Sequence, residues 1–258
     1  MTLRGPSARE AFRNADAYAE TMAPSLRTMA SGVVYRAALR PGERVLDAGT
    51  GTGIGVEAAR GDGREVIGLD ASPEMLAVAR AGLAEHEFVE ADFAAMPFEP
   101  ASFDVVLSVH ALLFADDPAA ALREWRRVTR PGGRLSLSVP GPAEHTPSAI
   151  YADVYARHGA RTGRPTDYPT QATLREWAAA AGWSSVATDA DPRTAIRLAD
   201  TERFDRWLSV GSRGVELGGR PEAERRALAD DLLAVTPREP DGTLRIPFGT
   251  LYLTARSG

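Results

Sequence analysis

Hydrophobic and polar positions divide the chain into segments with two different rhythms. Through the first forty residues, apolar positions come at helical spacing, and Pro24 is expected to break or offset the helix. From residue 44 onward, short apolar runs alternate with stretches of helical periodicity. Helix starts are predicted at Ser72-Pro73 and Asp117-Pro118, where a capping side chain precedes proline. The apolar runs predict strands at 44–47, 65–69, 88–89, 103–109 and 135–139.

Strands that alternate with helices at this spacing predict an α/β fold with a Rossmann-like, doubly wound parallel sheet. Right-handed crossovers place helices on both faces of such a sheet. Ligands bind across the carboxyl ends of its strands. The segments to examine are therefore the loops that follow the strands, namely 49–53, Asp70, Asp92 and 108–114.

The first of these loops belongs to the stretch VLDAGTGTG, residues 45–53. Glycines at 49, 51 and 53 let a ligand approach the main chain closely. Asp70 ends the second strand about twenty residues later, where an acid can accept both ribose hydroxyl protons. Together they favour a nucleoside ligand. A flexible turn remains the alternative for the glycines, and simple turn-capping or loop roles remain open for Asp47 and Asp92.

A dinucleotide fits the glycine spacing poorly. Counted from Gly49, the third glycine of a G-x-G-x-x-G motif would fall on Ile54. A formal match at Gly53, Gly55 and Ala58 begins too far beyond the strand for a tight turn. A carboxylate at Asp47 would repel a phosphate, and it suits a ligand that carries ribose and a cationic amino-acid tail.

Composition narrows the function further. The 258 residues include no cysteine, which excludes disulfides, thiolate metal sites and cysteine nucleophiles. A net charge of −5 gives no electrostatic footprint for nucleic acid or an anionic membrane. No signal peptide and no apolar run of membrane-spanning length is recognised. We therefore expect a cytoplasmic protein.

Four segments in order give the chain a family resemblance. It resembles the class I S-adenosylmethionine-dependent methyltransferases, within the ubiquinone/menaquinone-biosynthesis-like (methyltransferase type 11) group. The resemblance covers roughly residues 40 to 140. The segments that carry it are VLDAGTGTG at 45–53, GLDASPEML at 68–76, VEADFAAMPFEPASFDVVLS at 89–108 and ALREWRRVTRPGGRLSLSV at 121–139.

This resemblance implies S-adenosylmethionine as the cofactor, with S-adenosylhomocysteine as its product. Asp47 and the glycines would line the methionine end, Asp70 would bind the ribose hydroxyls, and Asp92 would accept from the adenine amino group. Ala71 and Phe93 would flank the adenine, and Ser108 would lie near the sulfonium. The cofactor-binding residues expected from the resemblance are Asp47, Gly49, Thr50, Gly51, Gly53, Asp70, Ala71, Met75, Asp92, Phe93 and Ser108.

The family fold would have a seven-stranded sheet with a final antiparallel strand, expected at 244–255. Residues 1–40 would form an N-terminal helical lid, and 41–258 the methyltransferase domain with its cofactor core at 41–140. Further elements are expected in the C-terminal half: helices at 171–181, 201–210 and 221–235, strands at 183–187 and 195–198, and substrate-cap elements within 141–170 and 199–240.

Methyl transfer needs an aligned, dry site and no metal. His110 follows the fourth predicted strand and is the candidate base, although a purely pocket-shaping role is equally open. Candidate acceptor contacts are Tyr18, Phe114, Tyr151 and Tyr155, for which packing is the alternative. As the methyl acceptor, an apolar or aromatic small molecule is favoured over nucleic acid, and a protein substrate stays open. The methylated atom, the pathway and the oligomeric state stay open, as do a non-methylating reaction on the same cofactor, a non-catalytic binding protein and, more weakly, an NAD-dependent reductase.

Overall fold

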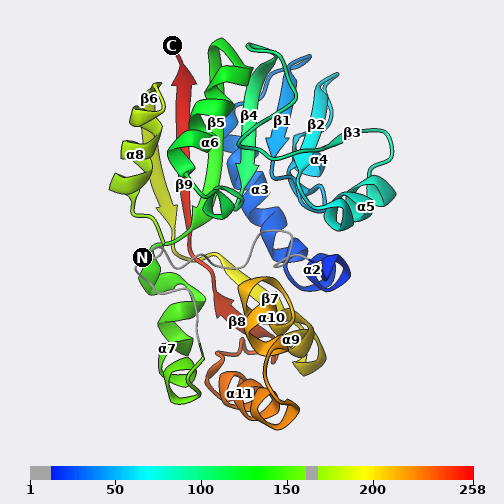
Figure 1. The fold of residues 1–258 in the computed structure, drawn as a ribbon, viewed down its shortest axis with the longest axis vertical. Helices are drawn as coiled ribbons and strands as arrows, with labels where there is room; N and C mark the ends of the chain where they lie inside the picture. Colours follow the sequence, from blue (N-terminus) through cyan, green and yellow to red (C-terminus); the bar gives the residue numbers. More distant parts are fainter. Residues whose placement is uncertain (1–12, 161–167) are drawn as a thin grey trace.

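The computed structural model describes residues 13–160 and 168–258, and its centre is a seven-stranded sheet (Figure 1). Residues 1–12 of the expected lid and 161–167 of the expected cap lie outside the described residues. The strand order is β3-β2-β1-β4-β5-β9-β6. The strands are β1 (Arg44–Ala48), β2 (Glu65–Asp70), β3 (Glu87–Glu90), β4 (Phe103–Val109), β5 (Thr129–Pro140), β6 (Trp183–Asp191) and β9 (Thr250–Ser257).

Both faces of the sheet are buried, as the doubly wound prediction requires. Along β1, Val45 packs into one apolar cluster and Leu46 into the other, because successive side chains of a strand point to opposite faces. The first cluster contains residues of α3 (Ala23–Ala37), α4 (Ile54–Ala59) and α5 (Pro73–Gly82). The second contains residues of α6 (Pro118–Val128) and α8 (Gln171–Ala180). All seven residues of β4 are buried.

The helix starts predicted from sequence are confirmed by their capping bonds. The Ser72 hydroxyl accepts from the Met75 amide at 3.2 Å at the start of α5. The Asp117 carboxylate accepts from the Ala120 amide at 3.0 Å at the start of α6. Pro24 lies in the first turn of α3, and the preceding helix α2 (Ala15–Thr21) ends before it. The expected offset near Pro24 therefore exists.

The prediction of one last strand at 244–255 is wrong in its extent. β8 (Leu244–Pro247) pairs instead with β7 (Ala195–Leu198) in a separate two-stranded sheet, and β9 begins at Thr250. The chain crosses between the sheets at Phe248 and Gly249. Gly249 is held there by two backbone bonds of 2.7 Å, one to the His145 carbonyl and one from the Gly141 amide. As expected, β9 is antiparallel to its neighbours.

A second group of elements lies beyond the carboxyl ends of the parallel strands, in the lower half of Figure 1. We call it the appended module. Two of its helices were not predicted: the one at Pro147–Arg157, in a stretch expected only to contribute to the cap, and α10, whose segment GSRGVELG has three glycines and poor helix propensity. The module consists of β7, β8, α7 (Pro147–Arg157), α9 (Thr201–Leu208), α10 (Gly211–Gly218) and α11 (Glu222–Val235).

Helix α2 lies between the central sheet and the appended module. The Glu20 carboxylate pairs with Arg206 of α9 at 2.8 Å, and the Asn14 amide donates to the Ser209 hydroxyl at 2.9 Å. In the part of the chain that is described, no helix is both long enough and apolar enough to span a bilayer.

Candidate functional site

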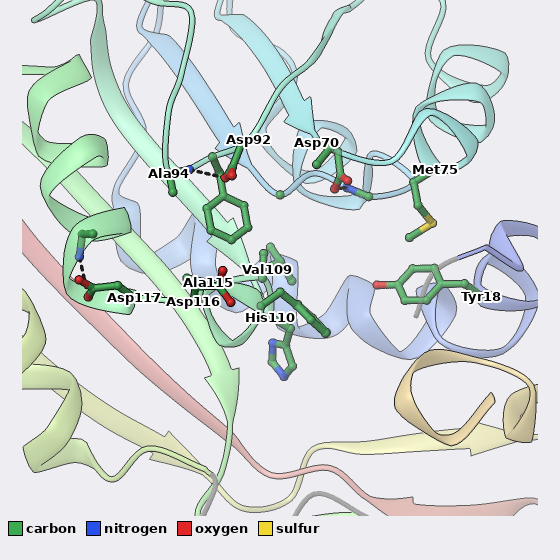
Figure 2. A pocket seen from close by; sticks show the side chains of 17 residues that line it. Tyr18, Asp70, Met75, Asp92, Ala94, Val109, His110, Ala115, Asp116 and Asp117 are labelled. Atoms are coloured by element: carbon green, nitrogen blue, oxygen red, sulfur yellow. Dashed lines mark hydrogen bonds between the residues drawn. The ribbon is translucent and has the colours of Figure 1, made fainter. Parts of the chain in front are cut away.

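A cavity of about 410 Å³ opens at the carboxyl ends of the parallel strands, between the sheet and α2 (Figure 2). It brings together residues from segments that are far apart in sequence. Ten of the residues predicted from sequence line it, namely Tyr18, Gly49, Gly51, Asp70, Ala71, Met75, Asp92, Phe93, His110 and Phe114.

Four other predicted cofactor residues stand behind this lining. Asp47, Thr50 and Ser108 are buried, and Gly53 is the N-cap residue that precedes α4. The Thr50 hydroxyl donates to the Asp47 carboxylate at 2.7 Å, and the Ser108 hydroxyl donates to the Ala48 carbonyl at 2.9 Å. In the structure these groups shape the loop from within rather than face the cavity.

The loop after β1 reaches the cavity with main chain rather than side chains. Gly49 and Gly51 have φ of +75° and +55°, a region that favours glycine. A Cβ added to Gly49 would also collide with the Cβ of Ala111. The amides of Gly49 and Thr50 both donate to the Leu69 carbonyl, at 2.8 and 2.9 Å. The loop is therefore fixed across the end of β2.

Asp70 links this loop to the start of α5. One carboxylate oxygen accepts from the Gly51 amide at 2.8 Å and the other from the Ser72 amide at 2.9 Å. Burial raises the pKa of Asp70, and these backbone bonds act in the opposite direction. Each carboxylate oxygen can accept more than one bond, so the side chain keeps acceptor capacity toward the cavity.

Asp47 is a buried carboxylate with one unsatisfied oxygen. Its Oδ1 has no hydrogen-bond partner, and burial raises the pKa of the group to about 7. Gly55 makes room for it, because a Cβ at that position would collide with the carboxylate. Sequence reasoning gave Gly55 no role in the site. The available signal was a glycine in the first turn of a short helix, where it is unfavourable.

The loop after β3 forms the opposite wall of the cavity. The Asp92 carboxylate accepts from the Ala94 amide at 2.8 Å (Figure 2). The Phe93 ring meets Trp125 edge-on, with centroids 5.8 Å apart, and the Trp125 indole donates to the Phe93 carbonyl at 2.9 Å. Trp125, a buried residue of α6, thus supports the wall.

His110 lies at the end of the cavity that faces the appended module. It has a φ of +58°, unusual for a residue other than glycine, and its Nδ1 is 2.8 Å from the Ser138 hydroxyl. Its ring stacks on Phe248, with centroids 5.3 Å apart. Burial lowers the pKa of His110 to about 3, so the ring is neutral at physiological pH. Its Nε2 is buried without a hydrogen-bond partner.

Tyr18 and Phe114 complete the lining. Figure 2 places the Tyr18 side chain across the cavity from Asp92. Burial, followed by the charges of Asp70 and Asp47, raises the pKa of Tyr18, which keeps the phenol neutral. Phe114 ends the short turn Leu112–Phe114 and is 42% exposed.

Tyr151 and Tyr155 do not line the cavity. Both are buried within the appended module, where their rings meet edge-on at 6.1 Å. Sequence reasoning also missed residues that do reach the site. Asp116 and Asp117 lie on its rim, and Phe248 contacts His110 from more than a hundred positions away. Asp117 was recognised only as a helix cap.

Comparison with known proteins accords with this fold and cavity. Residues 46–137 match the family model described as a methyltransferase domain. Over 168 residues the chain is 33% identical to a demethylmenaquinone methyltransferase of Renibacterium salmoninarum, covering 57% of this chain and 69% of that protein. It is 34% identical over 137 residues to a malonyl-[acyl-carrier protein] O-methyltransferase of Serratia marcescens, covering 53% and 54% respectively.

Among solved structures, a similar fold occurs in the Haemonchus contortus phosphoethanolamine N-methyltransferase 2 bound to phosphomonomethylethanolamine and S-adenosylhomocysteine. The TM-score is 0.59 at 21% identity, covering 89% of this chain and 52% of that one. The sheet, the cavity and these matches define a class I S-adenosylmethionine-dependent enzyme. The chain belongs to the methyltransferase domain family, in the menaquinone-biosynthesis-like group, and S-adenosylmethionine is its cofactor.

The residues present fit this cofactor. Main chain at Gly49 and Gly51 leaves space for a ligand, and Asp70 retains acceptor capacity for ribose hydroxyls. The unsatisfied oxygen of Asp47 adds a carboxylate beside the loop, which suits a ligand with a cationic tail.

Proposed function

We propose that the enzyme methylates a small acceptor with an apolar or aromatic body, by direct in-line displacement. The observation that carries the proposal is the single cavity that joins the glycine loop and Asp70 at one end to His110 at the other. When bound, the cofactor supplies a methyl group on a positively charged sulfur. The relative from Renibacterium salmoninarum is named as a demethylmenaquinone methyltransferase, which supports an apolar or aromatic acceptor.

Within this proposal, each end of the cavity has its own residues. Asp70 holds the ribose hydroxyls, Asp92 accepts from the adenine amino group, and Ala71 and Phe93 flank the ring. Asp47, Thr50, Gly53 and Ser108 hold the glycine loop and the strand end in shape from behind. Met75 closes the side of the cavity at Gly51, since its terminal methyl lies 3.2 Å from where a Gly51 Cβ would be.

The acceptor end is formed by His110, Tyr18 and Phe114 in this proposal. Neutral His110 offers its Nε2 to the acceptor's nucleophile when Nδ1 donates to Ser138. Because its pKa is low, His110 is a weak base that is nevertheless always unprotonated, and alignment supplies most of the rate. Residues 1–40 serve as the lid and the appended module as the substrate cap, with Tyr151 and Tyr155 inside that cap.

Calorimetric titration of the purified protein with S-adenosylmethionine, S-adenosylhomocysteine and NAD tests the cofactor site. We expect the first two to bind and NAD not to bind. Asp70→Ala should weaken binding by about a hundredfold or more, because two hydrogen bonds to a charged group are lost at about 1.5–3 kcal/mol each. The matched control is Asp153→Ala, an exposed acid on α7. Binding of NAD alone, or equal effects of both substitutions, would overturn the proposed site.

A further inference from the structure

Among the described residues, one arginine of the appended module, Arg213, has no acidic partner. The Arg213 guanidinium lies 3.7 Å above the centre of the Trp207 ring. Its one hydrogen bond among the described residues is a long one, 3.4 Å from Nη2 to the Trp207 carbonyl, and its Nε is buried without a partner. Burial lowers the pKa of Arg213. By contrast, Arg206 pairs with Glu20 and Arg220 pairs with Glu216.

The aromatic residues around Arg213 add further unused donors. The Tyr155 hydroxyl and the Trp207 indole nitrogen are both buried without hydrogen-bond partners. Burial raises the pKa of Tyr155, so its phenol keeps the hydrogen. The charge of Arg213 acts on the ionisation of both Tyr151 and Tyr155, which places these groups around it.

Tyr151 contributes acceptor capacity rather than a donor. The Thr236 hydroxyl donates its hydrogen to the Leu232 carbonyl at 2.8 Å. The 2.7 Å contact between Tyr151 and Thr236 is therefore donated by the tyrosine. After these bonds are assigned, the described part of the module holds buried donors without hydrogen bonds at the Arg213 Nε, the Tyr155 hydroxyl and the Trp207 indole nitrogen. The Nε atoms of Arg206 and Arg220 are in the same position, but those two guanidinium groups pair with glutamates, whereas Arg213 has no acidic partner among the described residues.

An unpaired charge and unsatisfied donors cost free energy when they are buried. A ligand that supplies acceptor oxygens and a negative charge would remove that cost, and guanidinium groups bind carboxylates and phosphates with matching geometry. The aromatic walls suit an apolar or aromatic body. We infer that the appended module binds an oxyanion, a carboxylate or phosphate group on such a body, with Arg213 as its main ligand and Tyr155 and Trp207 as donors.

This inference rests on the proposed function, because it makes the oxyanion an anchor of the methyl acceptor. Arg213 does not line the cavity that contains His110. Side-chain contacts nevertheless link Arg213 to His110. Phe248 stacks on His110 and belongs to the same apolar cluster as Tyr151 and Trp207. The anchored group is therefore distinct from the methylated atom. The acceptor carries an oxyanion at one end and its nucleophile at the other.

Binding of benzoate and phenyl phosphate to the full chain, at constant ionic strength, tests the inference, with benzamide as the uncharged control. Both oxyanions should bind and benzamide should not. The oxyanion that binds more tightly shows whether the module prefers a carboxylate or a phosphate group. Arg213→Met should weaken oxyanion binding by about tenfold to a hundredfold, through loss of charge-assisted hydrogen bonds. Arg203→Met, which removes an exposed arginine of α9, should leave it unchanged.

If Arg213 only stabilised the fold and bound no oxyanion, the thermal stability of its variants would differ from what we expect. Without any probe, Arg213→Met should unfold at the same temperature as wild type or higher, because it removes an unpaired charge. A marked loss of thermal stability that Arg213→Lys restores would overturn the inference. So would equal binding of benzoate and benzamide, or no oxyanion binding by wild type. Should Arg213→Met fail to fold, Tyr155→Phe removes a single donor and should weaken oxyanion binding severalfold.

Titration with S-adenosylmethionine separates this inference from the proposed function. Arg213→Met should bind the cofactor as wild type does, because Arg213 lies outside the cofactor end of the cavity. Failure of wild type to bind S-adenosylmethionine would reject the proposed cofactor site and leave the oxyanion result to be judged by itself. Normal cofactor binding without oxyanion binding would reject only the anchor.

Discussion

The cofactor end of the cavity and the appended module satisfy their polar groups in different ways. At the cofactor end, short side chains and main-chain amides bond to each other, as Asp70 does with Gly51 and Ser72. In the module, long aromatic and basic side chains leave buried donors unused at Tyr155, Trp207 and Arg213. The first region is held in shape by the chain itself. Among the described residues the second has no acceptors for these donors, and a ligand or water could supply them.

This difference separates the recognition of the cofactor from that of the acceptor. A ligand held by main chain depends on backbone conformation, which tolerates few substitutions. A ligand held by side chains can change when those side chains change, without any change in the fold. Substitutions at the cofactor end should therefore change folding stability and cofactor affinity. Substitutions in the appended module should change acceptor affinity instead.

The largest effect is expected at Gly49. Gly49→Ala should destabilise the protein by about 2–5 kcal/mol, from a positive φ and a collision with Ala111, and should abolish cofactor binding. Gly132→Ala is the matched control, because Gly132 has the same φ of +75° and no atom near its missing Cβ. It should cost only about 1–2 kcal/mol. Equal losses for both variants in urea unfolding would show that the contact with Ala111 is unimportant.

His110, at the boundary of the two regions, should make stability depend on pH. Its folded pKa of about 3 lies below the ordinary histidine pKa of 6.5, so between these values the unfolded chain binds a proton that the folded chain does not. Stability therefore falls as the pH falls. From pH 6.5 to 4.5, wild type should lose about 2–3 kcal/mol more than His110→Asn, a residue that tolerates positive φ.

Ser138→Ala sharpens the His110 experiment. The low pKa arises from burial, so removing the Nδ1 partner should lower stability by a similar amount at every pH and keep the slope. Urea unfolding across this pH range measures all three proteins. Parallel curves for wild type and His110→Asn would contradict the assignment of His110 as a buried neutral histidine.

The smallest effect concerns the contact that joins α2 to the module. Arg206 and Glu20 are 41% and 47% exposed, so Arg206→Met should cost at most about 1 kcal/mol of global stability. Hydrogen exchange of Ala15–Thr21 should nevertheless become faster, because α2 loses its ion pair with α9. Arg203, on the same helix, pairs with Asp200 and with no other acid among the described residues, so Arg203→Met serves as the control. Unchanged exchange in α2 would mean that the ion pair does not hold it.

The sequence predictions were more accurate for the cofactor end of the cavity than for the appended module. Gly49, Gly51, Asp70 and Asp92 were identified from their places after strands, and all of them line the cavity. Phe248 was not identified, because it lay inside one expected strand and only the crossing at Gly249 brings it to His110. Arg213 was missed for a related reason, since three glycines hid the helix that carries it.

The sequence by itself determined the doubly wound sheet, the helix starts, the glycine loop and the order of motifs that marks the family. These features depend on local periodicity, capping and backbone freedom, which operate over a few neighbouring residues. Only the tertiary structure decided that β8 and β9 belong to different sheets and that Asp47 stands behind the lining. It also decided that Arg213 lies half-buried against aromatic rings, with no acidic partner among the described residues. Burial and pairing of this kind depend on contacts between distant segments, and no short stretch of sequence records them.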